Sequence, residues 1–259
     1  MPIIGIDYNK CTICKQCIIE CPTTNFALDN EKEEVVFNPK SCIICGHCIA
    51  ICPEDAILYE DMKGKVLDIE DPTNLISQNA IHNIIVSKRS IRRYKNKEVP
   101  QEILDKVINS MSYAPTAMNL RTLKCRLISG AQKIKEFSER IIDTIEPENE
   151  RDEYKKRLEE GKNPFFYNAP HILLLHSKDG WGLINATITI TYAMLYAETL
   201  GLGSCWIGGI QRYLAQNKER TKAVLGISDR VCGIMILGYP AVKYYRAPPR
   251  APLRVKINM

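Results

Sequence analysis

Hydrophobic and polar residues follow two different patterns along this 259-residue chain, and the change comes near residue 60. Beyond that point, apolar residues recur at helical spacing in 79–88, 100–111 and 131–160. Pro100 stands where the first helical residue of its segment is expected. Alternating or continuous apolar runs predict strands at 123–129, 171–176 and 231–239. Together these elements predict an α/β (α+β) domain over residues 78–259.

Residues 1–60 lack such long periodic segments and predict a small separate domain. Short apolar runs at 35–37 and 56–59 indicate brief strands, with cysteines crowded between them. Residues 61–77 contain Asp71-Pro72 and few periodic signals, so we expect a linker there.

One long segment, 180–197, has no formal charge. It contains Asn185 and three threonines, which interrupt an otherwise apolar surface. These polar side chains favour a buried or interface helix over a membrane-spanning one. We therefore expect no membrane association.

Charge is unevenly distributed, although the net charge is only +5. Residues 1–60 hold four Lys/Arg and nine Asp/Glu, giving 4 − 9 = −5; the remainder holds 31 and 21, giving +10. An acidic module joined to a basic body suggests electrostatic docking between the two. No aromatic-interleaved basic motif accompanies this charge, so we do not expect nucleic-acid binding.

Eight of the eleven cysteines fall in two copies of C-x2-C-x2-C-x3-C-P, offset by 31 residues. This is the ligand run of bacterial ferredoxins with two [4Fe–4S] clusters, in which the fourth cysteine of each run binds the other cluster. The motif predicts two ligand sets: Cys11, Cys14, Cys17 and Cys52, and Cys42, Cys45, Cys48 and Cys21.

Structural zinc and disulfides are the alternatives for these cysteines. Zinc sites use paired cysteines, often with histidine, and disulfides need an oxidising compartment. The start Met1-Pro2-Ile3-Ile4-Gly5 does not resemble a signal peptide, so a cytoplasmic protein is expected. Cys125, Cys205 and Cys232 share no spacing and are expected to be inert thiols.

Four later segments carry a second kind of chemistry. They are the basic run 88–94 (KRSIRRY), the run 114–121 (APTAMNLR), the glycine-rich run 201–209 (GLGSCWIGG), and Gly238-Tyr239-Pro240 with Arg246 and Arg250 beyond it. Forked guanidinium donors and a serine hydroxyl suit a phosphate group, although a solvated charged turn is the plainer interpretation. Neither G-x-G-x-x-G nor a P-loop occurs.

In order and spacing, these segments resemble the flavin-dependent nitroreductase family over about residues 78–259. With the cysteine motifs in front, the chain looks like a ferredoxin–nitroreductase fusion. The resemblance implies FMN at a homodimer interface. It also implies the following contacts to FMN: Arg89, Ser90, Arg92 and Arg250 at the phosphate; Pro115, Thr116 and Asn119 along the ring and ribityl chain; Trp206, Ile207, Gly208 and Gly209 at the reactive edge.

Two positions depart from the family pattern. Leu120-Arg121-Thr122 stands where relatives often continue with Gln-Pro-Trp, and Gly208 replaces a frequent glutamate. Arg121 is therefore a candidate pocket residue that adds charge, and Thr116 a candidate proton source. Purely structural roles stay open as alternatives: Asn119 as a helix cap, Trp206 as core packing, and Tyr192 and Tyr196 as packing residues.

The function expected is that of an FMN-dependent oxidoreductase. One-electron carriers would supply electrons through two [4Fe–4S] clusters to FMN, which would reduce a small acceptor such as a nitroaromatic or quinone. A module serving a partner redox protein, and an NAD(P)H-dependent reductase with the clusters as outlet, are the alternatives. Cluster potentials vary over roughly −700 to +450 mV with environment, so the motif alone does not set the direction of flow.

Overall fold

The computed structural model describes residues 3–62 and 66–255, and these form two compact units. The first is Met1–Glu70 with Ala117–Arg121; the second is Asp71–Thr116 with Thr122–Met259. Part of the expected linker, 63–65, lies outside the described residues. The rest of that linker contains a short helix, α3 (Pro72–Leu75), whose first turn is capped by the Asp71 side chain.

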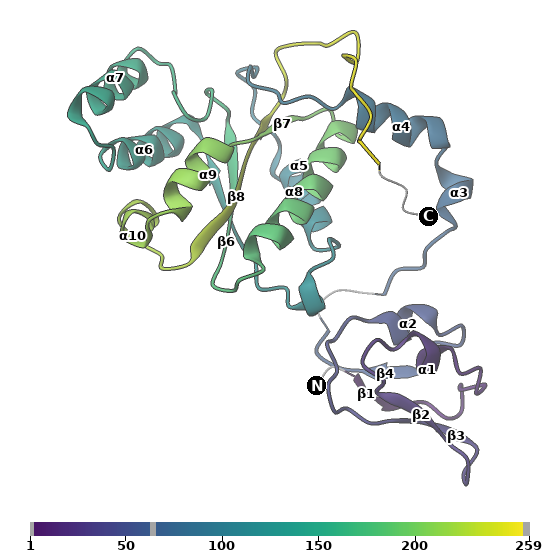
Figure 1. Ribbon diagram of the computed structural model, residues 1–259. Coiled ribbons are helices and arrows are strands. Elements are labelled where there is room, and N and C mark those ends of the chain that lie inside the picture. Colours follow the sequence, from purple (N-terminus) through teal and green to yellow (C-terminus); the bar gives the residue numbers. More distant parts are fainter. Residues whose placement is uncertain (1–2, 63–65, 256–259) are drawn as a thin grey trace. The chain divides into compact units, whose positions relative to one another are not determined.

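The first unit is a pair of two-stranded antiparallel sheets with two five-residue helices (Figure 1). β1 (Ile3–Ile6) pairs with β4 (Ile57–Tyr59), and β2 (Phe26–Asp29) pairs with β3 (Glu34–Phe37). The helices α1 (Gln16–Glu20) and α2 (His47–Ile51) occupy repeat-related positions, and both end directly before a cysteine. The expected strands near 35–37 and 56–59 are therefore confirmed.

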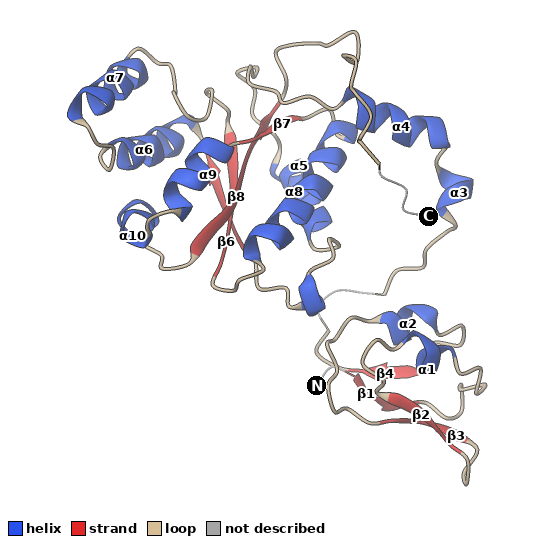
Figure 2. Ribbon diagram, in the orientation of Figure 1, coloured by secondary structure: helices blue, strands red, loops and turns tan. Residues whose placement is uncertain are grey.

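The second unit is built on a four-stranded antiparallel sheet in the order β5-β6-β8-β7 (Figure 2). Its strands are β5 (Lys124–Ser129), β6 (His171–Ser177), β7 (Gly203–Trp206) and β8 (Arg230–Gly238). β6 and β8 are central and almost wholly buried, which explains their continuous apolar sequence. β5 and β7 are the two edges among the described strands.

Helices cover both faces of this sheet (Figure 1). One face carries α5 (Gln101–Met111) and α8 (Gly182–Thr199), packed on Leu173 and Met235. The opposite face carries α6 (Ala131–Ile142), α7 (Glu148–Glu159), α9 (Gly208–Ala215) and α10 (Lys218–Leu225), packed on Ile172 and Ile234. Alternate residues of each strand thus enter opposite cores.

The remaining helix of this unit, α4 (Gln78–Ser87), begins after Ser77, whose hydroxyl accepts a hydrogen bond from the Ala80 N–H at 3.2 Å. The short 3₁₀ turn η1 (Ala117–Asn119) belongs to the first unit. Two expectations need correction. Pro100 is the cap before α5, not its first helical residue, because its backbone ψ of 142° is extended. Part of the glycine-rich run, Gly203–Trp206, forms strand β7 because it pairs with β8.

Candidate functional site: two cysteine cavities and a basic segment beside a glycine-rich strand

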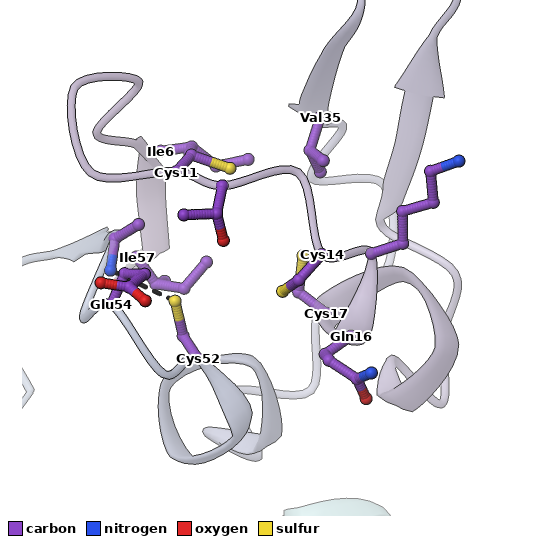
Figure 3. A pocket seen from close by; sticks show the side chains of 12 residues that line it. Ile6, Cys11, Cys14, Gln16, Cys17, Val35, Cys52, Glu54 and Ile57 are labelled. Atoms are coloured by element: carbon purple, nitrogen blue, oxygen red, sulfur yellow. Dashed lines mark hydrogen bonds between the residues drawn. The ribbon is translucent and has the colours of Figure 1, made fainter.

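The first cavity lies in the first unit, and four sulfur atoms point into it (Figure 3). They belong to Cys11, Cys14, Cys17 and Cys52. The backbone N–H of Ala56 donates to the Cys52 sulfur at 3.3 Å. Much of the remaining lining is apolar, including Ile6, Val35 and Ile57. The structure thus brings together the four cysteines that the sequence predicts for one cluster.

The second cavity has the complementary set of cysteines. It is lined by Cys21, Cys42, Cys45 and Cys48, with apolar walls from Ile3, Phe26 and Phe37. Asn25 is buried and lies against the Cys21 sulfur. His47 also lines this cavity. In both cavities, three cysteines come from one repeat and the fourth from the other, as the motif predicts.

The two cysteine loops also share backbone conformation at a spacing of 31 residues. Ile13 and Ile44 have φ of 57° and 55°, and Lys15 and Gly46 have φ of 62° and 77°. Left-handed backbone is uncommon for a residue other than glycine, above all for a β-branched one. That it occurs at matching positions shows that both loops adopt one tight conformation set by the repeat.

The thiols in each cavity act on one another electrostatically. Burial, helped by the neighbouring charge of Cys45 and Cys42, raises the pKa of Cys48 to about 11. Burial and the charges of Cys11, Cys14 and Cys52 likewise raise the pKa of Cys17. Four thiolates gathered in an apolar cavity repel one another, and bound iron cations would offset that repulsion. The donor set therefore fits a [4Fe–4S] cluster in each cavity.

The basic segment 88–94 lies along the glycine-rich strand in the second unit. Ser90 forms a parallel bridge with Ser204, and the Ile91 N–H donates to the Ser204 carbonyl at 3.0 Å. Gly203 permits this approach, because a Cβ there would come within 2.5 Å of Ile91. Arg89 lines a cavity of about 210 Å³ beside this contact, together with Gly201, Gly203, Pro240 and Tyr244.

The residues after β7 present backbone groups at a helix start. Gly208 and Gly209 open α9, and the first N–H groups of an α-helix have no partner within the helix. Trp206 is half-buried and packs against Gly233, where a Cβ would come within 2.6 Å of Ile190 and 3.0 Å of the Trp206 ring. The alternative of core packing therefore holds for the Trp206 ring, while its backbone stays a predicted flavin neighbour.

Two other arginines predicted to contact the FMN phosphate, Arg92 and Arg250, have different surroundings in the second unit. The Arg92 guanidinium lies 5.7 Å from the centre of the Tyr167 ring. Arg250 is exposed in the tail beyond β8. Arg89 and Ser90 are the residues of the phosphate set that lie beside β7, and the roles of Arg92 and Arg250 stay predictions.

The run 114–121 divides between the units. Ala114, Pro115 and Thr116 belong to the second unit. Within the first unit, Asn119 donates to the carbonyl oxygens of Ile43 and Ile44 at 3.0 and 2.7 Å, and accepts from Arg121 at 2.9 Å. Asn119 is thus engaged with the second cysteine loop, and its flavin contact stays a prediction.

Sequence reasoning missed the hydrogen bonds on the cysteine sulfurs. Asn25 and Thr23 surround Cys21, whereas the repeat-related positions are Ala56 and Glu54. Aligning the two halves at their offset of 31 residues would have shown this difference. A second omission is the buried pair of His176 and Asp229, at 2.8 Å, whose partners are 53 residues apart.

Comparison with known proteins gives two domain matches. Residues 85–239 match the nitroreductase family, and residues 3–53 match the 4Fe–4S dicluster domain. The chain is 24% identical over 174 residues to a Methanothermobacter thermautotrophicus protein with the provisional name NADH dehydrogenase/NAD(P)H nitroreductase, covering 64% of this chain and 80% of that one. It is also 24% identical over 197 residues to an FMN reductase [NAD(P)H] of Bacillus subtilis, covering 66% and 70%.

Solved structures share the fold of the second unit. A nitroreductase of Bacteroides fragilis with bound FMN aligns with a TM-score of 0.58 and 22% identity, over 70% of this chain and all of that one. A nitroreductase-like protein of Bacillus cereus aligns with a TM-score of 0.57 and 22% identity, over 68% and 94%. The family match covers more than half of the chain, and it agrees with this shared fold. The chain therefore belongs to the nitroreductase family of oxidoreductases, and it carries a 4Fe–4S dicluster domain ahead of its nitroreductase domain.

Proposed function

We propose that this chain is an FMN-dependent oxidoreductase that takes electrons through two [4Fe–4S] clusters to FMN and reduces a small acceptor such as a nitroaromatic or quinone. The observation that carries the proposal is the pairing of two four-cysteine cavities with a nitroreductase domain in a single chain. Clusters exchange single electrons, whereas a flavin exchanges one or two, so the combination converts one-electron input into two-electron reduction.

The cluster ligands proposed are the eight cysteines that line the two cavities. All of them are free thiols, which suits a reducing compartment such as the cytoplasm. For FMN, Arg89 and Ser90 beside β7 supply donors for the phosphate. The backbone N–H groups of Gly208 and Gly209 at the start of α9 supply donors for the reduced ring.

A homodimer is proposed because α8 carries large apolar side chains on its exposed side as well as on the side that faces the core. Ala186, Ile190 and Ala193 are buried in the core, yet Ile184 and Tyr192 are 53% and 43% exposed. Large apolar side chains gathered on one helix mark an interaction surface. Sedimentation equilibrium of wild type and Tyr192→Glu tests this: we expect a dimer for wild type and a weaker dimer with less bound FMN for the variant.

Anaerobic reduction of the fully loaded protein tests the electron route. Reduced ferredoxin and NADPH are added separately, and flavin absorbance and cluster EPR are followed together. We expect reduced ferredoxin to reduce clusters and flavin, and a nitroaromatic or quinone then to reoxidise both. Failure of every acceptor to reoxidise the reduced protein would contradict the proposal and favour a module that serves a partner protein.

The alternative with NAD(P)H as donor has one observation in its favour, which is that both relatives named above carry names that include NAD(P)H. If NADPH reduces the flavin first and the clusters follow, the clusters are an outlet. The order in which the two signals change separates this alternative from the leading proposal.

A further inference from the structure

The two cysteine cavities can be compared position by position because they are related by a 31-residue offset. Cys21 corresponds to Cys52, and both sulfurs accept a backbone N–H from four residues onward. Asn25 N lies 3.2 Å from the Cys21 sulfur, and Ala56 N lies 3.3 Å from the Cys52 sulfur. Each sulfur therefore receives one comparable backbone hydrogen bond from the residue four positions onward.

The side chains around these sulfurs differ. Asn25 Nδ2 lies 3.8 Å and Thr23 Oγ1 lies 3.9 Å from the Cys21 sulfur. Asn25 Nδ2 also donates to Thr23 Oγ1 at 2.6 Å, so the threonine oxygen accepts there and its hydroxyl proton can turn to the sulfur. At the corresponding positions beside Cys52, Ala56 has no polar side chain, and Glu54 has a carboxylate, a hydrogen-bond acceptor, in place of the threonine hydroxyl.

The Asn25 amide is held in this orientation from its other end. Its Oδ1 accepts the N–H of Ser41 at 3.2 Å, so its Nδ2 faces Cys21 and Thr23. Asn25 is only 2% exposed, and Ser41 directly precedes Cys42. One buried side chain thus links the Cys21 sulfur to the backbone directly before Cys42, and this contact fixes the direction of its donors.

Formal charges do not offset this difference. Lys15 and Glu54 line the first cavity with opposite sign, and Asp55 is paired with Lys10 at 3.9 Å. His47 lines the second cavity, and its ring N–H adds a donor on the side that already has more donors. Hydrogen bonds to sulfur favour the more negative, reduced state of a cluster and so raise its potential.

We propose that the two cluster sites differ in reduction potential, with the site of Cys21, Cys42, Cys45 and Cys48 the higher, and that Asn25 with Thr23 is the device that sets the difference. The inference rests on the proposed function insofar as both cavities hold [4Fe–4S] clusters. Asn25 is a positioning residue, since it acts through the sulfur of Cys21.

The difference in reduction potential would give electron transfer between the two cluster sites a preferred direction. A low-potential one-electron donor, such as a reduced ferredoxin, supplies one electron. Transfer between the sites oxidises the first cluster by one electron and reduces the second by one, with no bond made or broken. The loop between Cys42 and Cys45 is also the one that Asn119 binds, at Ile43 and Ile44. Asn119 follows the predicted flavin residues Pro115 and Thr116 in the sequence, and its contact with this loop lies within the first unit.

An EPR-monitored redox titration of the fully loaded protein with dithionite tests the proposal. In wild type, we expect a single electron to prefer one site at least tenfold, which for one electron is about 59 mV. Asn25→Ala reproduces the Ala56 environment, and Thr23→Val removes only the hydroxyl. Both variants should lower the higher midpoint and leave the lower one in place.

Thr24→Val is the matched control, because Thr24 is exposed beside Thr23 and the substitution is the same. It should move neither midpoint. Iron content and circular dichroism check that each variant is folded and loaded; if Asn25→Ala does not load, Thr23→Val still decides the question. Equal midpoints in wild type, or a fall in the lower midpoint of the Asn25 and Thr23 variants, would overturn this inference and leave the proposed function standing. Fewer than eight irons per chain in wild type would overturn the proposed pair of clusters as well.

Discussion

The two compact units bury their interiors differently. The second encloses a four-stranded sheet between two hydrophobic cores, and residues such as Leu174 and Ile234 are fully buried. Among the described residues of the first, the hydrophobic core contains seven buried residues, one of them Cys48, with further cysteines packed around them. Much of the interior of the first unit is therefore lined by cysteines, whose thiolates would repel one another. Apolar burial stabilises the second unit, whereas we expect the first to depend on the iron–sulfur clusters proposed for its cavities.

The largest effect is expected when a strong chelator removes iron from the loaded protein under anaerobic conditions. Because the first unit has so small a core, we expect amide hydrogen exchange to lose protection over most of 3–62. Protection in β6 and β8 should persist. Equal loss of protection in both units would show that their stabilities are not separate.

The next largest effect is expected from Asp229→Ala in the second unit. Asp229 is 5% exposed and binds His176 at 2.8 Å and Lys124 at 3.4 Å. Removal of one partner of a buried hydrogen bond costs about 1–3 kcal/mol. Urea unfolding should show this loss in the second unit, with cluster EPR unchanged. Lys124→Ala is the control: its side chain is 64% exposed, and about 1 kcal/mol or less is expected.

This pair also has a pH signature. Burial alone would raise the pKa of Asp229, but the hydrogen bonds and charges of His176 and Lys124 hold that pKa below its usual range. A lowered carboxyl pKa contributes stability that is fully present above the unfolded value, about 3.9, and is lost as the pH falls through the folded value. The wild-type and Asp229→Ala unfolding curves should therefore converge only in acid.

A smaller and local effect is expected from Asn217→Ala. The Asn217 side chain caps α10 by accepting the Arg220 N–H at 3.0 Å. Loss of such a cap costs about 1 kcal/mol. Thermal unfolding of the second unit should shift by a few degrees, with the first unit unaffected. Asn217→Asp, which keeps an acceptor, should restore most of the loss.

The smallest effect is expected from His171→Leu, which should reduce the dependence of the free energy of unfolding on pH. His171 is 6% exposed and contacts Ser129 at 2.9 Å. Burial lowers its pKa, opposed by the charge of Glu98. A lowered histidine pKa makes the unfolded state take up a proton first, so stability falls as the pH drops below about 6.5. Urea unfolding at pH 5 and pH 8 should differ more in wild type than in the variant.

Much of the second unit could be predicted from local pattern. The runs 171–176 and 231–239 became β6 and β8 because central strands buried on both faces must be apolar throughout. β7 was not predicted, because Gly203 and Ser204 have poor strand propensity and form a strand through pairing with β8. Tertiary pairing of that kind has no local signal.

The candidate sites likewise combine features that have a local sequence signal with features that depend on tertiary contacts. The cysteine sets follow from spacing, because the repeat fixes which residues come from each loop. The engagement of Asn119 with Ile43 and Ile44 could not be predicted, because those residues lie about 75 positions away in sequence. Met118, Asn119 and Arg121 have φ of 49°, 53° and 48°, a conformation that local sequence does not favour.

The edge position of β5 has a consequence for how copies of the chain can associate. An unpaired strand edge is a template on which another strand can add, and such addition leads to open-ended aggregates. Here Lys124 and Arg126 place exposed positive charge along that edge. A second copy arriving edge to edge would bring like charges together. The sheet is thereby protected from growth on this side, which is compatible with the closed dimer proposed to form through α8.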